Sequence, residues 1–523
     1  MKLFSENKNI FVLCILLTIT IITTTAASEI PRTPLEESGH FTTYNEMITY
    51  LKKIEKRSTI IKITETGKSA NHNTPLYAVR IDTGSKPDDE KLRIMITARV
   101  HGSEPAGMEA AIRFIRDMAF RPEYKYISDE ATFMIIPCAN PDGTATAIGN
   151  YRENGGFWDK TGRYNSQILD INRDFNAAET PETRNCISVF NQFKPHLVID
   201  LHEFAGTPVV AGEEGWWRGR YFDELIGAGR NPDVYPPISH FSRMICENIL
   251  FPELKAKGIR TFYYPSASGN LDTTYRFGAT GADYYNLRNS FSFLIETGIY
   301  DQGESTIKKR TDRHIFTLGI IIREFIKNKK AVIKMTEDSK TFSKERTSIT
   351  IKQKLVPYEA EIDGRKASDY IFTTNYNVDG KTYKAVSKVY LRAADPARQE
   401  TKDLPAGYAV ICQDSEFIEK LLLHGIQVYE TESVIRTDKG TLPAHVFYIP
   451  ASQESSAILS FIMEPDSYRK NRFALVQRAI INPVENSIDL NQCKRILTTE
   501  DINNTIERFY IFMEDILKNS QQK

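Results

Sequence analysis

Between residues 40 and 330, short apolar runs alternate with longer segments in which apolar residues recur every three or four positions. The runs LRIMITARV, ATFMIIPCAN, HLVIDLHEF and SFSFLIETG predict strands. The segments GMEAAIRFIRDMA, PETRNCISVFNQF, HFSRMICENILFPELKAKG and IKKRTDRHIFTLGIIIREFIKN predict amphipathic helices. Because the strand segments are apolar throughout, both faces of their sheet should be buried. The pattern predicts an α/β domain with helices on both faces of a central sheet.

Two stretches interrupt this alternation, residues 141–169 and 205–237, and both are long and rich in glycine and aromatic residues. Long segments without periodicity usually form functional walls or lids in a compact domain. A basic, polar stretch at residues 327–334 follows the last predicted helix, and we place a domain boundary near residue 330. Beyond it, GYAVICQ, EFIEKLLLHGIQVYE and HVFYIPASQESSAILSFIM predict a smaller α/β or β-rich C-terminal domain, residues 331–523, to which we assign no role.

The N-terminus has the features of an export signal. Lysines precede the apolar stretch IFVLCILLTITII at residues 10–22, and small residues follow it, among them Thr25-Ala26-Ala27. The apolar stretch is short for a membrane span, and its flanks are typical of a signal peptide. We expect residues 1–27 to be a cleaved signal peptide and residues 28–330 to form the first domain. The mature protein should be secreted or periplasmic, without stable membrane association; an uncleaved anchor is the alternative.

Composition and charge narrow the classes of partner. The 523-residue chain has 67 lysines and arginines and 67 aspartates and glutamates, so its formal net charge is zero. No charge excess favours nucleic acid or an anionic membrane as a partner. Of six cysteines, Cys14 lies in the signal, and the other five are widely and irregularly spaced. This spacing is typical neither of a disulfide framework nor of a structural zinc site, although one or two disulfides are compatible with it.

Ionisable residues end three of the predicted strands. His101 and Glu104 follow LRIMITARV, His202 lies in HLVIDLHEF, and Glu296 lies in SFSFLIETG. Ligands of open α/β sheets bind where loops leave the carboxyl ends of the strands. Two histidines and one glutamate are a ligand set of catalytic zinc sites. A zinc ion there would polarise a carbonyl and activate water, and Glu296 would move the proton to the leaving nitrogen.

Asp200 lies two residues before His202, so the two share a face of the predicted strand. The aspartate either supports the histidine from behind or makes a local hydrogen bond at the strand end. The sequence leaves both interpretations open.

Five short motifs occur in a fixed order: His101 and Glu104 in HGSE, NPDG at residues 140–143, LDINRDF at 169–175, DLHE at 200–203, and FLIETG ending at Gly298. In this order they resemble the zinc metallocarboxypeptidase family (peptidase family M14) over roughly residues 40–330. The resemblance implies a mixed central sheet, one zinc ion per chain, a peptide substrate and release of C-terminal amino acids. The region after residue 330 faintly resembles the C-terminal extension of large bacterial members.

The resemblance implies that His101, Glu104 and His202 bind the zinc and that Glu296 is the catalytic glutamate. Asp170 would orient His101, because a ligand histidine commonly donates its second N–H to a carboxylate.

The family also has residues that bind the substrate. Asn172 and Arg173 match the Asn-Arg pair that receives the terminal carboxylate, which suits the fork of a guanidinium. Arg163 is our choice for the arginine that polarises the scissile carbonyl, with Arg152 as the alternative. Tyr275 has about the right spacing for the tyrosine that closes over the substrate. Tyr284 and Tyr285 compete for that assignment.

Three other functions remain as alternatives. A peptidoglycan-peptide amidase or peptidase, or a deacylase of N-acyl amino acids, would keep the same fold and zinc ligands. A non-catalytic binding relative would share the fold alone. Retention of both histidines, both glutamates and the Asn172–Arg173 pair speaks against the last of these, and the predicted export speaks against the deacylase.

Overall fold

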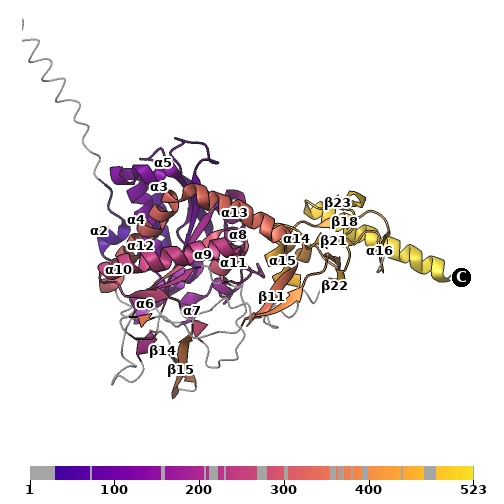
Figure 1. Cartoon of the computed structure of the whole chain (residues 1–523). Coiled ribbons are helices and arrows are strands. Elements are labelled where there is room, and N and C mark those ends of the chain that lie inside the picture. Colours follow the sequence, from indigo (N-terminus) through magenta and orange to yellow (C-terminus); the bar gives the residue numbers. More distant parts are fainter. Residues whose placement is uncertain are drawn as a thin grey trace, which may run out of the picture.

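The computed structural model in Figure 1 describes most of the chain after the predicted signal peptide. It covers residues 30–523 except 71–72, 155–159, 205–207, 211–221, 229–230, 265, 268–279, 300–303, 354–360, 363–364, 367–369, 379–380, 391–398, 438–439, 464–478 and 522–523. Residues 1–27 and Tyr275 therefore lie outside the described residues. Among the helices that are described, none is long and apolar enough to cross a membrane.

The centre of the first part of the chain is an eight-stranded mixed sheet in the order β1-β2-β4-β3-β5-β10-β7-β8. The strands are β1 Ile61–Lys68, β2 Pro75–Ile81, β3 Leu92–Ala98, β4 Ala131–Ile136, β5 Leu197–Phe204, β7 Glu224–Ala228, β8 Thr261–Tyr263 and β10 Phe291–Gly298. The middle strands β4, β3, β5 and β10 run parallel, so their carboxyl ends meet at one edge. Each strand predicted from an apolar run is present in this sheet.

Helices cover both faces of the sheet, which confirms the predicted fold class. The helices of this part are α2 Pro34–Ser38, α3 Tyr44–Glu55, α4 Ala106–Phe120, α5 Lys125–Glu130, α6 Pro141–Asn154, α7 Lys160–Arg163, α8 Pro181–Phe193, α9 Pro236–Ile245, the π-helix η4 Cys246–Leu250, α10 Phe251–Ala256, α11 Gly281–Leu287, α12 Ile307–Lys327 and α13 Lys329–Lys344, with the 3-10 turns η1 Pro122–Tyr124, η2 Ile171–Arg173 and η5 Glu304–Thr306. Alternate residues of β5 point to opposite faces. Gly107 of α4 packs against Leu201, whereas Gly281 of α11 approaches Asp200. The two faces of β5 therefore meet α4 and α11, respectively.

Residues 141–169 were predicted as a long loop, and this prediction is wrong for their first half. Helix α6 occupies Pro141–Asn154. Asn140 Oδ1 accepts a hydrogen bond from the Gly143 N–H at 2.8 Å, as an N-cap side chain does, and proline is well tolerated in the first turn. The NPDG motif is thus a helix start, although Gly143 and Gly149 concealed the helical pattern of α6.

The C-terminal part is a smaller α/β unit, as predicted. Its elements are β11 Ser348–Gln353, β12 Glu361–Ile362, β13 Arg365–Lys366, β14 Tyr370–Val378, β15 Lys381–Tyr390, β16 Gln399–Asp403, β17 Gly407–Cys412, α14 Glu416–Leu423, β18 Tyr429–Thr431, β19 Ile435–Thr437, β20 Gly440–Leu442, β21 Phe447–Pro450, α15 Ser456–Met463, β22 Ala479–Val484, η10 Leu490–Gln492, β23 Cys493–Arg495 and α16 Thr499–Gln521. A five-stranded sheet, β22-β17-β21-β18-β23, forms its centre. Helix α16 extends away from the rest of the molecule (Figure 1).

One hairpin of this region, β14–β15, joins the first part of the chain. Strand β14 pairs with β6, Pro208–Val210, and β15 pairs with β9, Ser266–Ala267. Strand β6 begins four residues after the end of β5. The hairpin therefore ties together two segments that flank β7 and β8 in the sequence.

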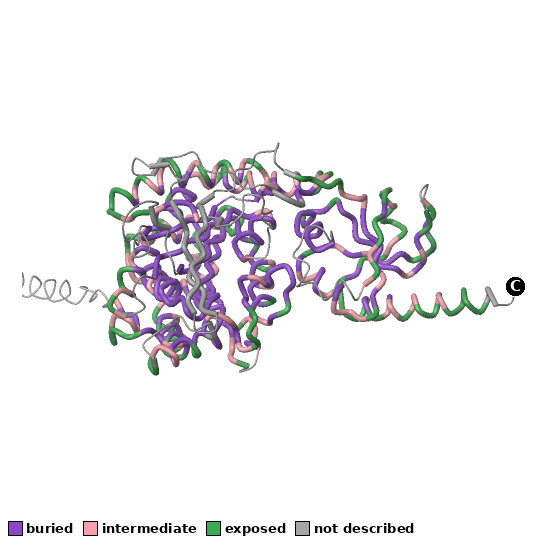
Figure 2. The backbone as a smooth tube through the Cα atoms, turned by 90° about the horizontal axis from the view of Figure 1, so that it is seen from below, coloured by how far each residue is buried: buried purple, intermediate pink, exposed green. Residues whose placement is uncertain are grey.

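The two parts share one hydrophobic core. Buried apolar side chains of the large sheet belong to the same packed cluster as Phe417 and Leu421 of α14, and Figure 2 shows buried residues in both parts. Tyr284 Oη lies 3.0 Å from His424 Nδ1, and Asn191 Nδ2 donates to the Leu423 carbonyl at 2.6 Å. At the predicted boundary, α12 and α13 are separated only by Asn328. A division of the chain at residue 330 stays a prediction.

The described cysteines, Cys138, Cys186, Cys246, Cys412 and Cys493, are free thiols.

Candidate active site

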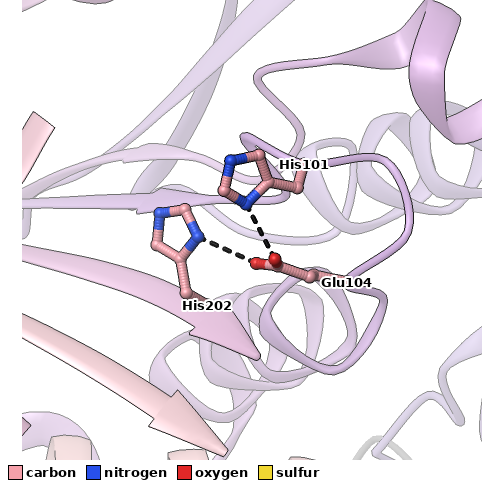
Figure 3. A group of neighbouring side chains, drawn as sticks. All are labelled: His101, Glu104 and His202. Carbon is pink, nitrogen blue, oxygen red and sulfur yellow. Dashed lines mark hydrogen bonds and ion pairs between the residues drawn. The ribbon is translucent and has the colours of Figure 1, made fainter. Parts of the chain in front are cut away.

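Two histidines and one glutamate meet at the carboxyl edge of β3 and β5. His101 follows β3, Glu104 lies two residues before α4, and His202 lies on β5. Figure 3 shows both imidazoles facing the single carboxylate: His101 Nδ1 lies 2.7 Å from Glu104 Oε1, and His202 Nδ1 lies 2.8 Å from Glu104 Oε2. All three side chains are buried, and their ligand atoms lie within 4.8 Å of one another.

Each histidine is held from behind by an aspartate. His101 Nε2 lies 3.1 Å from Asp170 Oδ1, and His202 Nε2 lies 3.1 Å from Asp200 Oδ2. These contacts turn both Nδ1 atoms inward, so that two nitrogens and a carboxylate converge on one point. That donor set, with carboxylates behind the imidazoles, fits a zinc ion. Of the two interpretations of Asp200, the structure supports the one in which it contacts His202.

The charges of the cluster stabilise one another. Burial opposes ionisation of Glu104, but His101 and His202 hold the pKa of its carboxyl well below the usual range. Burial likewise opposes protonation of His202, yet the Asp200 and Glu104 carboxylates raise the pKa of the imidazole well above its usual value. The buried carboxylates therefore create a site of strong negative potential, which attracts a cation.

Glu296 lies beside His202 on the neighbouring parallel strand. Glu296 of β10 is in register with His202 of β5, and residues in register on parallel strands point to the same face. The side chain is 8% exposed. Burial, together with the nearby Glu104 carboxylate, raises the pKa of Glu296 to about 7. A carboxyl with a pKa near neutrality can both accept and return a proton.

Arg163 reaches the cluster from the end of α7. Its Nε donates to Asp170 Oδ2 at 3.1 Å, and its Nη1 lies 3.6 Å from Glu104 Oε1. Arg152, the alternative, is exposed near the end of α6, where its charge acts on Glu46. The structure thus brings Arg163 to the site and leaves Arg152 at the surface.

Asn172 and Arg173 lie on the 3-10 turn η2, next to the cluster. Asn172 Oδ1 accepts from the Gly281 N–H at 2.8 Å, and its Nδ2 lies 3.5 Å from His202 Nε2. Arg173 is partly exposed, and its Nη1 donates to the Asn172 carbonyl at 2.7 Å. Turn η2 begins after Asp170, whose Oδ1 accepts from the Asn172 N–H. The Asp170 carboxylate therefore connects the LDINRDF motif to His101.

The two competing tyrosines are structural. The Tyr284 hydroxyl accepts from Arg288 and contacts His424, and the ring of Tyr285 stacks on Phe190. Both are fully buried. A buried position of this kind does not suit a group that closes over a substrate. Tyr275 lies outside the described residues.

The NPDG motif supports the turn that carries His101. A Cβ at Gly102 would lie 2.0 Å from the backbone carbon of Gly143, so only glycine allows this approach. Asn140 Nδ2 donates to the Val100 carbonyl at 3.2 Å. These contacts connect the NPDG motif to the turn that carries His101, although the motif contributes no residue to the cluster.

Sequence reasoning missed the residues that support the cluster from the opposite face of the sheet. Glu203, Arg310 and His314 are buried there. Glu203 lies in the DLHE motif, but nothing in the sequence indicated a partner on α12.

Comparisons with known proteins agree with this geometry. Residues 47–208 match the family model described as zinc carboxypeptidase. Carboxypeptidase 2 of Trichophyton equinum is 22% identical over 419 residues, which cover 73% of this chain and 73% of the relative. Carboxypeptidase E of Caenorhabditis elegans is 28% identical over 148 residues, which cover 27% of this chain and 30% of the relative.

Solved structures with similar topology include carboxypeptidase A from Helicoverpa armigera. It is 17% identical with a TM-score of 0.43, over 62% of this chain and 82% of that one. A metallo-carboxypeptidase from Burkholderia cenocepacia is 15% identical with a TM-score of 0.40, over 54% of this chain and 68% of that one. The family match and the ordered motifs place residues 47–208 in the zinc carboxypeptidase family, a family of metallopeptidases.

Proposed function

We propose that the protein is an exported zinc-dependent carboxypeptidase that removes C-terminal amino acids from peptides. The observation that carries the proposal is the convergence of His101 Nδ1, His202 Nδ1 and the Glu104 carboxylate at one point. These three residues would hold one zinc ion per chain. When bound, the ion would act as a Lewis acid on the substrate carbonyl and lower the pKa of water at the site.

Glu296 is the general base of this proposal. Its pKa near 7 allows it to take a proton from the attacking water and to return it to the departing amine. It lies in a buried site, where a proton transfer does not compete with bulk solvent.

Arg163 would stabilise the negative charge that develops on the carbonyl oxygen. Its guanidinium is held by Asp170 and lies near Glu104, so its position is set before the substrate binds. Donors that are already oriented stabilise a developing charge without reorganisation.

Asn172 and Arg173 would bind the carboxylate at the end of the substrate. Arg173 is partly exposed beside the buried Asn172, so it is accessible to an incoming anion. A guanidinium binds a carboxylate through two parallel hydrogen bonds. This pair would limit the substrates to peptides with a free C-terminus.

The signal-like N-terminus supports export. The mature protein would be secreted or would act in the periplasm. Its balanced charge gives no electrostatic support for nucleic acid as a partner.

The test measures metal content and hydrolysis of a mixed peptide library for the wild type and for Glu296→Gln. We expect one zinc per chain in both proteins, with C-terminal residues released only by the wild type. Appreciable turnover by Glu296→Gln would contradict the role of Glu296. Bound zinc without release of any C-terminal residue would contradict the carboxypeptidase activity. Cell-wall peptides would then be the substrates to test.

A further inference from the structure

Glu203 follows His202 on β5 but points to the opposite face of the sheet, toward α4 and α12. Successive strand residues alternate between faces, and the register pairs Glu203 with Thr297 just as it pairs His202 with Glu296. The Glu203 side chain is fully buried. Burial raises the pKa of its carboxyl, against the lowering effect of Arg310.

The Glu203 carboxylate contacts three separate segments. Oε2 accepts from the Ala106 N–H at 2.8 Å, and Oε1 accepts from Arg310 Nη1 at 3.0 Å and from the Thr297 hydroxyl at 3.4 Å. Ala106 lies two residues after Glu104, and Thr297 lies immediately after Glu296. One carboxylate therefore holds the segments that carry two residues of the candidate site.

The backbone of Glu203 also takes part. Its N–H donates to Glu104 Oε2 at 3.1 Å, the same oxygen that faces His202. Glu203 thus fixes Glu104 directly through its backbone and indirectly through Ala106. A shift of Glu203 would move the Glu104 carboxylate relative to the imidazoles of His101 and His202.

Helix α12 supplies the partners of Glu203. Arg310 is 2% exposed, and the Nε2 atom of His314, one turn later, lies 3.2 Å from the Thr297 hydroxyl. Burial and the charge of Arg310 lower the pKa of His314 to about 3, so the imidazole is neutral. The single hydroxyl proton of Thr297 goes to Glu203, and His314 Nε2–H therefore donates to the Thr297 oxygen.

A buried ion pair is weak support for stability, because apolar side chains of similar volume often replace it without loss. Apolar side chains would not hydrogen-bond Ala106 and Thr297. The pair here fixes the relative positions of the three segments that carry Ala106, Thr297 and Arg310.

We propose that the Glu203–Arg310 pair is a positioning device that sets the distances among Glu104, His202 and Glu296 from behind the sheet. The inference rests on the proposed function of the site. Both side chains meet on the face of the sheet opposite His202 and Glu296, so both act through the residues they hold.

The test compares Glu203→Gln, Arg310→Met and the double variant Glu203→Gln/Arg310→Met. The single variants leave a buried group without its partner, so both stability and activity should fall. The double variant removes the unpaired charge, and its melting temperature should recover. The zinc affinity of the double variant should nevertheless stay about ten- to a hundredfold weaker than that of the wild type. Competition with a chelator, starting from the metal-free protein, measures this affinity.

Kinetics provide a second measurement. In the double variant kcat should fall while KM for a peptide stays near the wild-type value, because the residues that bind substrate are untouched. Wild-type zinc affinity together with wild-type kcat in the double variant would overturn the proposal.

Matched controls separate positioning from structure. Arg313 also lies on α12 and forms a buried ion pair, with its Nη2 2.6 Å from Asp223 Oδ1. Arg313→Met/Asp223→Asn should alter stability without a comparable loss of zinc affinity. An equal loss of zinc affinity in this control would contradict a specific role for Glu203.

Thr297→Val offers a variant with little risk to folding, and Thr297→Ser keeps the hydroxyl. The valine variant should lower kcat and the serine variant should restore it; equal kcat in the two would contradict the role of this hydrogen bond. If the wild type itself binds no zinc or releases no residue, the proposed function fails. If the wild type behaves as proposed and the double variant matches it, only the positioning role fails.

Discussion

Asp200 Oδ2 lies 3.1 Å from His202 Nε2, two residues further along the same strand. The second oxygen of Asp200 accepts from the Thr97 hydroxyl at 2.5 Å, so the carboxylate is fixed between β3 and β5. Because Nε2 of His202 contacts Asp200, its Nδ1 faces Glu104. Asp170 does the same for His101 from a different segment.

This relationship predicts the effect of Asp200→Asn. The amide is nearly isosteric but lacks the charge that stabilises the imidazole orientation, so zinc affinity should fall by about ten- to a hundredfold. Competition with a chelator measures the change. Asp117→Asn is a control, because Asp117 is also buried but pairs with Arg116 and Arg121 at the C-terminal end of α4. Unchanged zinc affinity in Asp200→Asn would argue against a role of Asp200 in orienting His202.

Arg173→Lys should weaken binding of substrates with a free C-terminus. Lysine keeps the charge but loses the two parallel hydrogen bonds. A hydrogen bond to a charged group contributes about 1.5–3 kcal/mol, so KM should rise roughly ten- to a hundredfold. The same peptide with an amidated C-terminus serves as the control. An equal change on both substrates would show that Arg173 does not bind the carboxylate.

Glu224 predicts a dependence of stability on pH. Its side chain on β7 is buried, with one hydrogen bond from the Thr317 hydroxyl, and burial raises its pKa from 4.5 to about 8. Between these values the folded state holds a proton that the unfolded state has lost. Stability should therefore fall as the pH rises through this window, by up to about 1.4 kcal/mol per pH unit from this group.

Glu224→Gln removes the titrating group and keeps an oxygen for Thr317. Urea unfolding from about pH 5 to about pH 8 should show a shallower decline in the variant than in the wild type. Glu345→Gln changes an exposed glutamate and controls for the loss of one surface charge. Parallel curves for the wild type and Glu224→Gln would contradict the prediction.

A chain that ends at Lys330 should be less stable and less active than the full chain. It would expose core side chains that pack against α14, lose the partner of Tyr284 at His424 and leave β6 without β14. Thermal unfolding and peptide hydrolysis of both chains measure the effect. A fragment with full stability and full activity would show that the C-terminal region is dispensable.

Much of the fold and of the metal cluster was predictable from local patterns. Apolar runs without alternation predicted the buried strands, and three- and four-residue spacing predicted the long helices. Because the carboxyl ends of parallel strands meet at one edge, His101, Glu104, His202 and Glu296 were expected to lie together. The first three do lie in one cluster, and Glu296 is in register with His202.

Long-range packing decided the rest. The choice between Arg163 and Arg152 depended on where the ends of α6 and α7 lie, and glycines concealed α6 itself. The partners Glu203 and Arg310 are 107 residues apart. Hydrophobic periodicity reports which face of one element is buried, but not which other element covers it. The contacts that orient the site are side-chain pairings between distant segments, and only the folded chain brings them together.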